Sequence, residues 1–321
     1  MTIIALRIAG RRVVPSSQNV IIGRSFGSKS SNEDEPLILT SLSENGIYTV
    51  QMNRPKQLNA WTQPMMFAIR DEFKQASNNE QVKVVILTGR GKYYCAGVNL
   101  SSLLMKPMPP AKLHSTIRQL NQALFEMFLD FPKPIICAMN GPAIGASVTS
   151  ATLCDAIVAS STATLSTPFA RLGLPPEGCS SVHFPQIMGD FNAQRMLGGE
   201  GWAPTAAEAK DIGLVYSVVE NDNEEHSNLL ATSQDLASQW ISENKPRSIG
   251  PKNANLTKLA KVNSNESIDL ADAFLSEKFL ERQATFLKSK NKTGPALALS
   301  ALRYLRPIWG RFLPPPGHGK M

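Results

Sequence analysis

Two short apolar runs, each followed by a turn that contains a glycine, constrain the fold of this chain more than any other feature. The runs lie at 84–87 and 134–139, and the glycines that follow them are Gly97 and Gly145. Compact apolar runs of this length between turn residues indicate buried strands. Residues 115–128 lie between them and carry apolar side chains at helical spacing. This alternation of strand and helix predicts an α/β domain.

The remaining elements are predicted from the same two periodicities. Alternating apolar residues predict a strand at 48–52, and another apolar run predicts one at 156–159. Thr62 is placed to cap a helix, and Ser115 is placed to open the helix of 115–128. The apolar face expected for the first helix comprises Met66, Ile69 and Phe73. Later helices are predicted at 190–197, 205–211, 225–241 and 267–287.

Basic residues are concentrated at the two ends of the chain. Residues 1–32 hold five Lys or Arg and residues 288–321 hold seven, with no acidic residue in either segment, although the whole chain carries a net charge of +7. The part between them is acidic on balance. A nucleic-acid-binding protein is expected to be basic on its folded surface, so no nucleic-acid partner is expected.

The Arg- and Ser-rich composition of residues 1–32 is typical of a mitochondrial transit peptide, and a disordered tail is the alternative. A mitochondrial matrix location is therefore predicted, with a peroxisomal one as the alternative. The last residues, Gly319-Lys320-Met321, differ from the Ser-Lys-Leu type of peroxisomal signal.

Residues 291–321 form a basic, amphipathic segment in which leucines and Trp309 alternate with arginines. One interpretation is a helix that contacts a membrane surface or a partner. The other, slightly favoured, is a helix that packs on its own subunit or on a neighbouring one. The four cysteines have no paired spacing, so neither a metal site nor a disulfide framework is predicted.

Three separate segments together hold the parts of one chemical site. Two contain the turns at Gly97 and Gly145, where glycine lets the backbone approach a ligand closely. The third, 176–181, reads Pro-Glu-Gly-Cys-Ser-Ser and offers the carboxylate of Glu177. Two backbone N–H groups that face a carbonyl, together with one base, suffice to move a proton beside that carbonyl.

The order and spacing of these segments resemble the crotonase (enoyl-CoA hydratase/isomerase) superfamily over residues 38–288. The 176–181 turn is most similar to that of the peroxisomal-type Δ3,Δ2-enoyl-CoA isomerases. The resemblance implies a crotonase-like spiral of ββα turns followed by a helical C-terminal trimerisation region. The expected division is a crotonase domain at 37–290, with its spiral core ending near 190, in a homotrimer or hexamer.

The resemblance also implies roles for individual residues. The oxyanion hole would be formed by the backbone N–H groups of Val98 and Ala146, the latter at the start of a helix at 146–153. Glu177 would be the single catalytic base. Hydratases of the superfamily use two glutamates, and the corresponding positions here hold Thr149 and Phe169.

Coenzyme A is expected as the carrier of the substrate, with no separate cofactor. The resemblance places Ala96 at the adenine, with Gly97, Gly145 and Lys56 as further contacts with the acyl-CoA. The predicted activity is isomerisation of 3-enoyl-CoA to trans-2-enoyl-CoA in fatty-acid β-oxidation. The alternatives are a non-catalytic acyl-CoA-binding or protein-interaction homologue, an enoyl-CoA hydratase, and a dienoyl-CoA isomerase, which would need further acids in the pocket.

Other polar residues near these segments are expected to be structural. His183 is interpreted as a core or helix-face histidine, Asp155 as a structural carboxylate and Asn99 as a residue that caps a loop. Ser180 and Ser181 are interpreted as polar groups at the start of a helix.

Overall fold

The computed structural model describes residues 35–99, 108–220, 226–253, 255–289 and 291–313. The predicted transit peptide at 1–32 lies outside the described residues. Among the helices of the described residues, none is long and apolar enough to cross a membrane.

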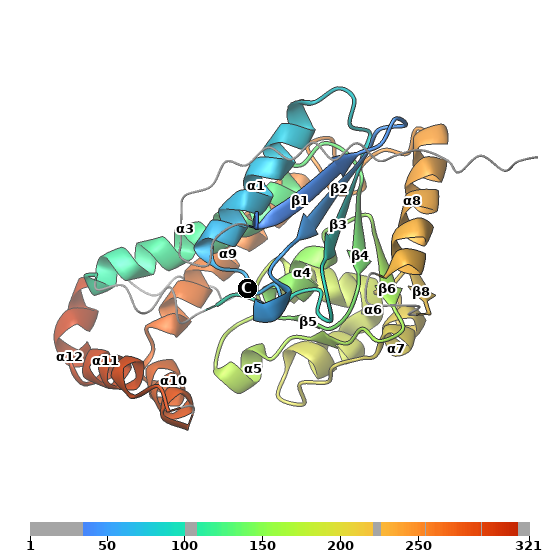
Figure 1. Cartoon of the computed structure of the whole chain (residues 1–321). Helices are drawn as coiled ribbons and strands as arrows, with labels where there is room; N and C mark the ends of the chain where they lie inside the picture. The colour runs from blue at the N-terminus through green and yellow to red at the C-terminus, as the bar shows by residue number, and fades with distance from the viewer. Residues whose placement is uncertain (1–34, 100–107, 221–225, 254, 290, 314–321) are drawn as a thin grey trace, which may run out of the picture.

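A six-stranded sheet forms the centre of the molecule (Figure 1), with strand order β1-β2-β3-β4-β6-β8. The strands β1 and β2 pair antiparallel, and every other pair is parallel. The predicted strands are confirmed as β2, β3, β4 and β6. The sequence patterns did not reveal the half-buried β1 and β8, which lie at the two edges of the sheet. The bounds are β1 Ile38–Leu42, β2 Ile47–Met52, β3 Val84–Gly89, β4 Ile135–Met139, β6 Ala156–Ser160 and β8 Ser217–Val219.

A second, two-stranded parallel sheet pairs β5 (Ala143–Ile144) with β7 (Leu165–Ser166). Each strand has only two residues, which is too short to show a hydrophobic period. This small sheet begins four residues after β4 ends at Met139, and it carries the chain towards Gly145. It therefore positions one of the two glycine turns.

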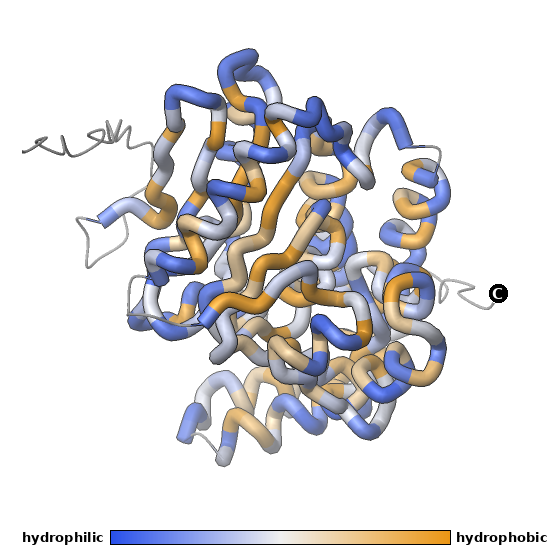
Figure 2. The backbone as a smooth tube through the Cα atoms, turned by 90° about the vertical axis from the view of Figure 1, so that its right-hand side faces the viewer, coloured by the Kyte–Doolittle hydropathy of each residue, from blue (hydrophilic) through white to orange (hydrophobic). Residues whose placement is uncertain are grey.

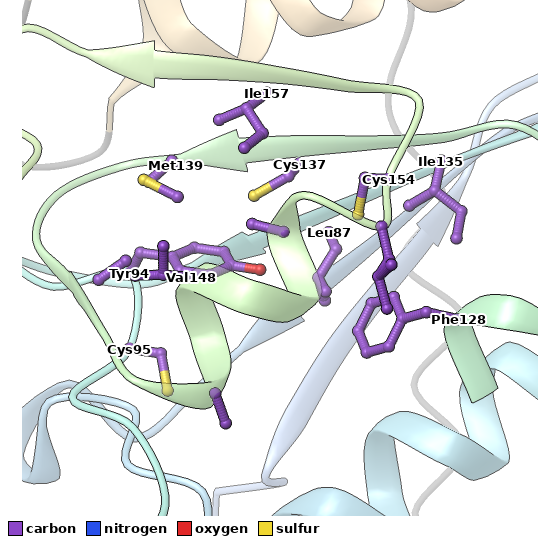
Figure 3. Packing of buried hydrophobic residues seen from close by; sticks show 14 of the residues in the cluster. Leu87, Tyr94, Cys95, Phe128, Ile135, Cys137, Met139, Val148, Cys154 and Ile157 are labelled. Carbon is purple, nitrogen blue, oxygen red and sulfur yellow. The ribbon is translucent and has the colours of Figure 1, made fainter. Parts of the chain in front are cut away.

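Both faces of the central sheet are covered by helices, which explains why β3 and β4 are apolar at almost every position. On one face, Ile86, Ile136 and Val158 pack against Trp240 and its neighbours on α8 (Ser227–Ser242). On the other face, Leu87, Cys137 and Met139 lie opposite Tyr94 and Val148, as Figure 3 shows. Figure 2 shows the hydrophobic stretches along the interior strands and the hydrophilic ones at the outer turns.

The first helix confirms its predicted cap. α1 spans Gln63–Asn78, and the side-chain oxygen of Thr62 accepts a hydrogen bond from the N–H of Met65. Ile69 and Phe73 are buried as expected, whereas Met66 is only half-buried and Met65 takes its place in the core.

The second helix, α3 (Pro110–Leu129), begins five residues before the predicted start at Ser115. Pro110 is tolerated at the first helical position because its missing N–H would have no partner there. The hydroxyl of Ser115 donates to the carbonyl of Lys112 inside the helix, so Ser115 is not a cap.

One predicted helical boundary in the C-terminal half is wrong. The helix predicted at 190–197 is confirmed as the part of α6 (Ser180–Leu197) that follows a kink at Gly189, and the part before the kink contains Pro185. The single helix predicted at 267–287 is two helices, α9 (Leu256–Phe274) and α10 (Glu277–Ser289). The break occurs where the Ser276 hydroxyl accepts the N–H of Phe279 and so begins a new helix. The other two predictions match α7 (Ala206–Asp211) and α8 closely.

The helices after residue 290 pack on their own chain. α11 (Thr293–Tyr304) and α12 (Arg306–Trp309) bury Ala296, Leu299 and Trp309 in one apolar cluster with α3, α9 and α10. Figure 1 shows α10–α12 together at one end of the molecule, beside α3 and α9. The interpretation that this segment packs on its own subunit is thus supported for its buried face. Leu297, Tyr304 and Ile308 remain exposed, and contact with a membrane surface stays a prediction.

A buried ion pair joins the sheet to the loop after α8. The Asp155 carboxylate accepts hydrogen bonds from the Ile135 N–H, the Arg247 guanidinium and the Ser248 N–H, and the Asp155 side chain is fully buried. Arg247 also donates to the carbonyl of Leu153. Asp155 is therefore structural, as predicted.

Replacement of Arg247 by leucine should leave Asp155 buried without its countercharge. We expect Arg247→Leu to lower the free energy of unfolding by about 3–5 kcal/mol, measured by urea denaturation. Arg70→Leu is the control, because Arg70 pairs with Asp71 on the surface, where such pairs contribute ~1 kcal/mol or less. Equal effects of the two substitutions would show that the Asp155–Arg247 pair does not anchor the sheet.

Candidate active site

Two buried asparagines hold the loop that follows β3. The Asn140 side-chain oxygen accepts the Gly89 N–H at 2.9 Å, and its amide nitrogen donates to the carbonyl of Gly91 at 2.7 Å. Asn59 donates to the carbonyl of Tyr93 at 2.8 Å. Sequence reasoning missed the role of both residues, because Asn140 before Gly141-Pro142 has the pattern of an ordinary turn and nothing local distinguishes Asn59. Their hydrogen bonds fix the path of the chain from β3 towards Gly97.

The two glycine turns lie directly against each other. The N–H of Ile144 donates to the carbonyl of Cys95 at 3.0 Å. Gly97 has φ 83°, and a Cβ atom there would lie 2.6 Å from the carbonyl oxygen of Ile144. A side chain at residue 97 would therefore collide with backbone, so the contact requires glycine. The predicted proximity of the two segments is confirmed.

Ser147 fastens the second turn to the first. Its hydroxyl lies 3.1 Å from the carbonyl oxygen of Cys95 and 3.0 Å from the N–H of Ile144. It is fully buried in α4 (Ala146–Ala151), which ends two residues before the predicted boundary at 153. The Ser147 side chain thus strengthens the contact between the two turns.

The two N–H groups predicted to form an oxyanion hole are both available. No acceptor in the described part of the chain takes the N–H of Val98 or of Ala146. Ala146 is the first residue of α4, where the N–H has no partner within the helix. Because backbone N–H groups are strong hydrogen-bond donors, these two are suited to donate to a ligand.

Glu177 lies in the loop between α5 (Phe169–Leu172) and α6, and it is only 7 % exposed. Glu177 is therefore a buried carboxylate, although a glutamate between proline and glycine in a turn is usually exposed to solvent. The next residue, Gly178, has φ 68°, and a Cβ atom there would lie 2.5 Å from the Phe125 ring and 2.7 Å from the Thr149 hydroxyl. This close packing holds the turn beneath α3 and α4.

One cavity contains the Glu177 side chain and Val98, and it lies between α1, α3 and α9. Asn121 is a polar residue in its wall and donates from its amide to the Ser267 hydroxyl. Most of the wall is apolar and comprises Trp61, Met66, Ile117, Leu120, Leu124, Leu174, Leu270 and Phe274. The structure thus unites the predicted base with one predicted N–H donor, and the Ser147 contacts place Ala146 beside the same turn.

The environment of Glu177 raises its pKa to about 8, first through burial and second through the negative charge of Glu266. In addition, no group in the described residues donates a hydrogen bond to the Glu177 carboxylate. An ionised carboxylate that has lost water and gained no donor binds protons tightly. Glu177 is therefore equipped to act as a base near neutral pH.

The positions of the two hydratase glutamates hold residues that cannot accept a proton from water. The Thr149 hydroxyl is buried and donates to the Ala146 carbonyl at 3.2 Å. Phe169 is buried, and its ring lies 4.0 Å from the Cβ position of Gly145. Glu177 is the carboxylate in the wall of this cavity as the structure describes it.

Two of the predicted coenzyme A contacts, Ala96 and Lys56, lie on segments joined by a backbone hydrogen bond. The Ala96 N–H donates to the carbonyl of Leu58 at 2.9 Å, whereas no described group donates to the Ala96 carbonyl. Lys56 is exposed on the short 3₁₀ turn Pro55–Gln57, just before Leu58. This arrangement leaves the Ala96 carbonyl and the Lys56 ammonium accessible on neighbouring segments.

The remaining polar residues have structural partners. His183 lies 2.9 Å from the carbonyl of Thr152, and burial lowers its pKa, in agreement with a core histidine. The Ser180 hydroxyl donates to the carbonyl of Glu177, and Ser181 contacts Glu266. Asn99 is exposed at the cavity wall. Sequence reasoning missed Glu266, because this glutamate lies 89 positions beyond Glu177 on α9.

The raised pKa of Glu177 predicts a pH-dependent cost in stability. The carboxyl ionises near 4.5 in the unfolded chain but near 8 in the folded one, so the wild type loses stability as the pH rises through this window. We expect the melting temperature of Glu177→Gln to exceed that of the wild type by more at ~pH 9 than at ~pH 5. Glu80→Gln, an exposed control, should show a constant difference. A constant difference for Glu177→Gln as well would contradict the raised pKa.

Comparisons with known proteins agree with this geometry. A family model described as Enoyl-CoA hydratase/isomerase matches residues 43–281. The chain is 42% identical over 193 residues to "Enoyl-CoA delta isomerase 2" of Homo sapiens, covering 59% of this chain and 48% of the human protein. It therefore spans about half the length of that relative. It is 32% identical over 286 residues to the Rattus norvegicus protein of the same name, covering 86% of this chain and 70% of that protein.

A solved structure shows the same fold. The enoyl-CoA hydratase/isomerase from Pseudoalteromonas atlantica T6c superposes with a TM-score of 0.67 at 28% sequence identity, covering 79% of this chain and 97% of that chain. Because the family model matches most of the chain, it shows the family in addition to the fold. The chain belongs to the enoyl-CoA hydratase/isomerase family and has the mixed α/β crotonase fold with C-terminal helices.

Proposed function

We propose that this protein is a Δ3,Δ2-enoyl-CoA isomerase that acts in the β-oxidation of unsaturated fatty acids. The observation that carries the proposal is the buried carboxylate of Glu177, the one that the described residues place in an apolar cavity, together with a Val98 N–H that no described acceptor takes. The names of the human and rat relatives support the same activity.

The proposed reaction is a 1,3-proton shift. The Glu177 carboxylate takes a proton from C2 of the 3-enoyl thioester, and the electron pair of that C–H bond moves into the thioester, placing negative charge on its oxygen. The N–H groups of Val98 and Ala146 donate to this oxygen and stabilise the dienolate. Glu177 then returns the proton to C4, so that the C=O bond reforms and the double bond lies between C2 and C3. Atoms and charge balance without any other reactant.

The apolar wall supports both the substrate class and the reaction. Side chains of α3 and α9 present hydrocarbon surface that fits a fatty acyl chain. A bound acyl chain would displace water from the cavity, which strengthens the hydrogen bonds to the dienolate. Hydration of a 2-enoyl thioester is disfavoured because Thr149 and Phe169 occupy the positions of the carboxylates that would activate water.

A non-catalytic acyl-CoA-binding homologue is the second candidate. A protein that only binds acyl-CoA gains nothing from a carboxylate whose burial destabilises the fold. The burial of Glu177 therefore favours the enzyme.

The isomerase is tested with the purified full-length chain and its Glu177→Gln variant. Each receives trans-3-hexenoyl-CoA and, separately, trans-2-hexenoyl-CoA, and the products are separated by chromatography. We expect the wild type to interconvert the two without adding water, and Glu177→Gln to lose at least ~10²-fold in kcat, as for removal of a general base. Glu80→Gln serves as the control and should match the wild type.

Two outcomes would overturn the proposal. Conversion of trans-2-hexenoyl-CoA into the 3-hydroxy product would identify a hydratase. Retained binding of the thioester without any turnover by the wild type would identify a non-catalytic binding protein.

The cavity wall also predicts which residues limit the acyl chain. Phe274 lines the cavity from α9, and its ring packs on Phe279 of α10 with centroids 4.6 Å apart. Shortening this side chain should enlarge the cavity. We expect Phe274→Leu to raise kcat/KM for 3-dodecenoyl-CoA relative to 3-hexenoyl-CoA, measured as a ratio within each variant. Phe312→Leu, at an exposed position, should leave the ratio unchanged; an unchanged ratio for Phe274→Leu would show that this wall does not set chain length.

A further inference from the structure

Glu266 makes three hydrogen bonds to the turn that carries Glu177. Its carboxylate accepts the N–H of Cys179 at 2.6 Å, the N–H of Ser181 at 3.0 Å and the hydroxyl of Ser181 at 2.5 Å. Glu266 lies on α9 and is only 6 % exposed. Buried carboxylates are rare unless they are paired with a cation, and no ion pair of Glu266 with a basic side chain is present in the described residues.

The turn that Glu266 holds has an unfavourable backbone. Gly178 and Cys179 both have positive φ, 68° and 64°, and a non-glycine residue such as Cys179 is strained in this region. Within the turn, the Ser180 hydroxyl donates back to the carbonyl of Glu177 at 2.7 Å. An external anchor is therefore needed to keep the turn in one place, and the Glu266 carboxylate supplies it.

The same face of α9 builds both the anchor and the cavity wall. Leu270 and Phe274 follow Glu266 at intervals of four residues, which places all three on one side of a helix. Leu270 and Phe274 line the cavity into which Glu177 projects. The position of the base and the shape of the substrate cavity are thus set by one rigid element.

The charge of Glu266 also acts on Glu177. The negative charge of Glu266 acts on Glu177, and that of Asp269 of α9 acts on Glu266, while Asn121 of α3 and Ser267 of α9 are neutral. Burial raises the pKa of Glu266 too, but its hydrogen bonds to Ser181 and Cys179 oppose this shift. Glu177 has no such donors. When the pair holds one proton, the proton resides on Glu177 and Glu266 is the ionised partner.

We propose that Glu266 is a positioning residue for the reaction: its carboxylate anchors the Glu177 turn to α9, and its fixed negative charge makes Glu177 a stronger base. The kinetic consequences of this proposal rest on the proposed isomerase function. The anchoring of the turn and the effect of the Glu266 charge on Glu177 do not depend on that function.

The first test compares kinetics of the full-length wild type, Glu266→Gln and Glu266→Ala over pH, with Glu80→Gln as the exposed control. The wild type should gain activity as the pH rises towards about 8, because only ionised Glu177 accepts a proton. Glu266→Gln retains an acceptor oxygen but has no charge, so the midpoint of its kcat/KM profile should move to lower pH. Glu266→Ala removes the anchor, and its kcat should fall on the order of 10²-fold with KM little changed.

The second test needs no turnover. The infrared spectrum of each protein is recorded with and without the Glu177→Gln substitution, and the difference between the two spectra isolates the carboxyl band of Glu177. Titration of this band with pH gives the midpoint of Glu177 ionisation directly. Glu266→Gln should lower the midpoint, and Glu80→Gln should not. If the wild type fails to isomerise but the midpoint still moves, the isomerase proposal fails while the electrostatic role of Glu266 stands.

Two results would overturn the proposal for Glu266. The first is an unchanged Glu177 midpoint in Glu266→Gln. The second is that the Glu266 variants yield less folded protein but keep the wild-type kcat per folded molecule. A purely structural role of Glu266 would give this result. If Glu266→Ala does not fold, Glu266→Gln decides both points.

Discussion

The site depends on the parallel pairing of β3 with β4. Parallel neighbours end at the same edge of a sheet, so the chain leaves both strands at one place. Asn140, directly after β4, then reaches across to the loop after β3 and holds it by hydrogen bonds at Gly89 and Gly91. The close contact of the two glycine turns and the orientation of the Val98 and Ala146 N–H groups follow from this pairing. A shift in register would separate the two donors.

The basicity of Glu177 has a different origin, namely the burial of its carboxylate away from water. Glu177 receives no hydrogen bond from the described residues and faces apolar side chains, and both conditions favour its protonated form. The resulting instability is tolerated because the turn is fastened at several points, through Gly178 beneath Phe125 and through the Glu266 carboxylate. Reactivity and local rigidity are thus linked in this loop.

The elements and residues that could be predicted from the sequence are those with a local signal. β3 and β4 show as apolar runs, Thr62 stands beside the helix it caps, and the resemblance of the three segments led to the prediction of Val98, Ala146 and Glu177 as site residues. The residues that were missed act over long distances in the chain. Asn59, Asn140 and Glu266 are recognisable only once their partners are adjacent in space, since nothing local distinguishes them from turn or surface residues. The break between α9 and α10 was missed because Ser276 interrupts the apolar pattern by only a few residues.

The C-terminal helices share their apolar cluster with α3 and α9, the two helices that also form much of the cavity wall. Ile117, Leu270 and Phe274 have one side towards the cavity and another towards α10–α12. In evolution, the residues that set the size of the substrate can therefore change independently of those that carry out the reaction. Changes in the last fifty residues can reshape the acyl compartment from behind, while the strands and glycine turns that hold the reacting groups remain untouched.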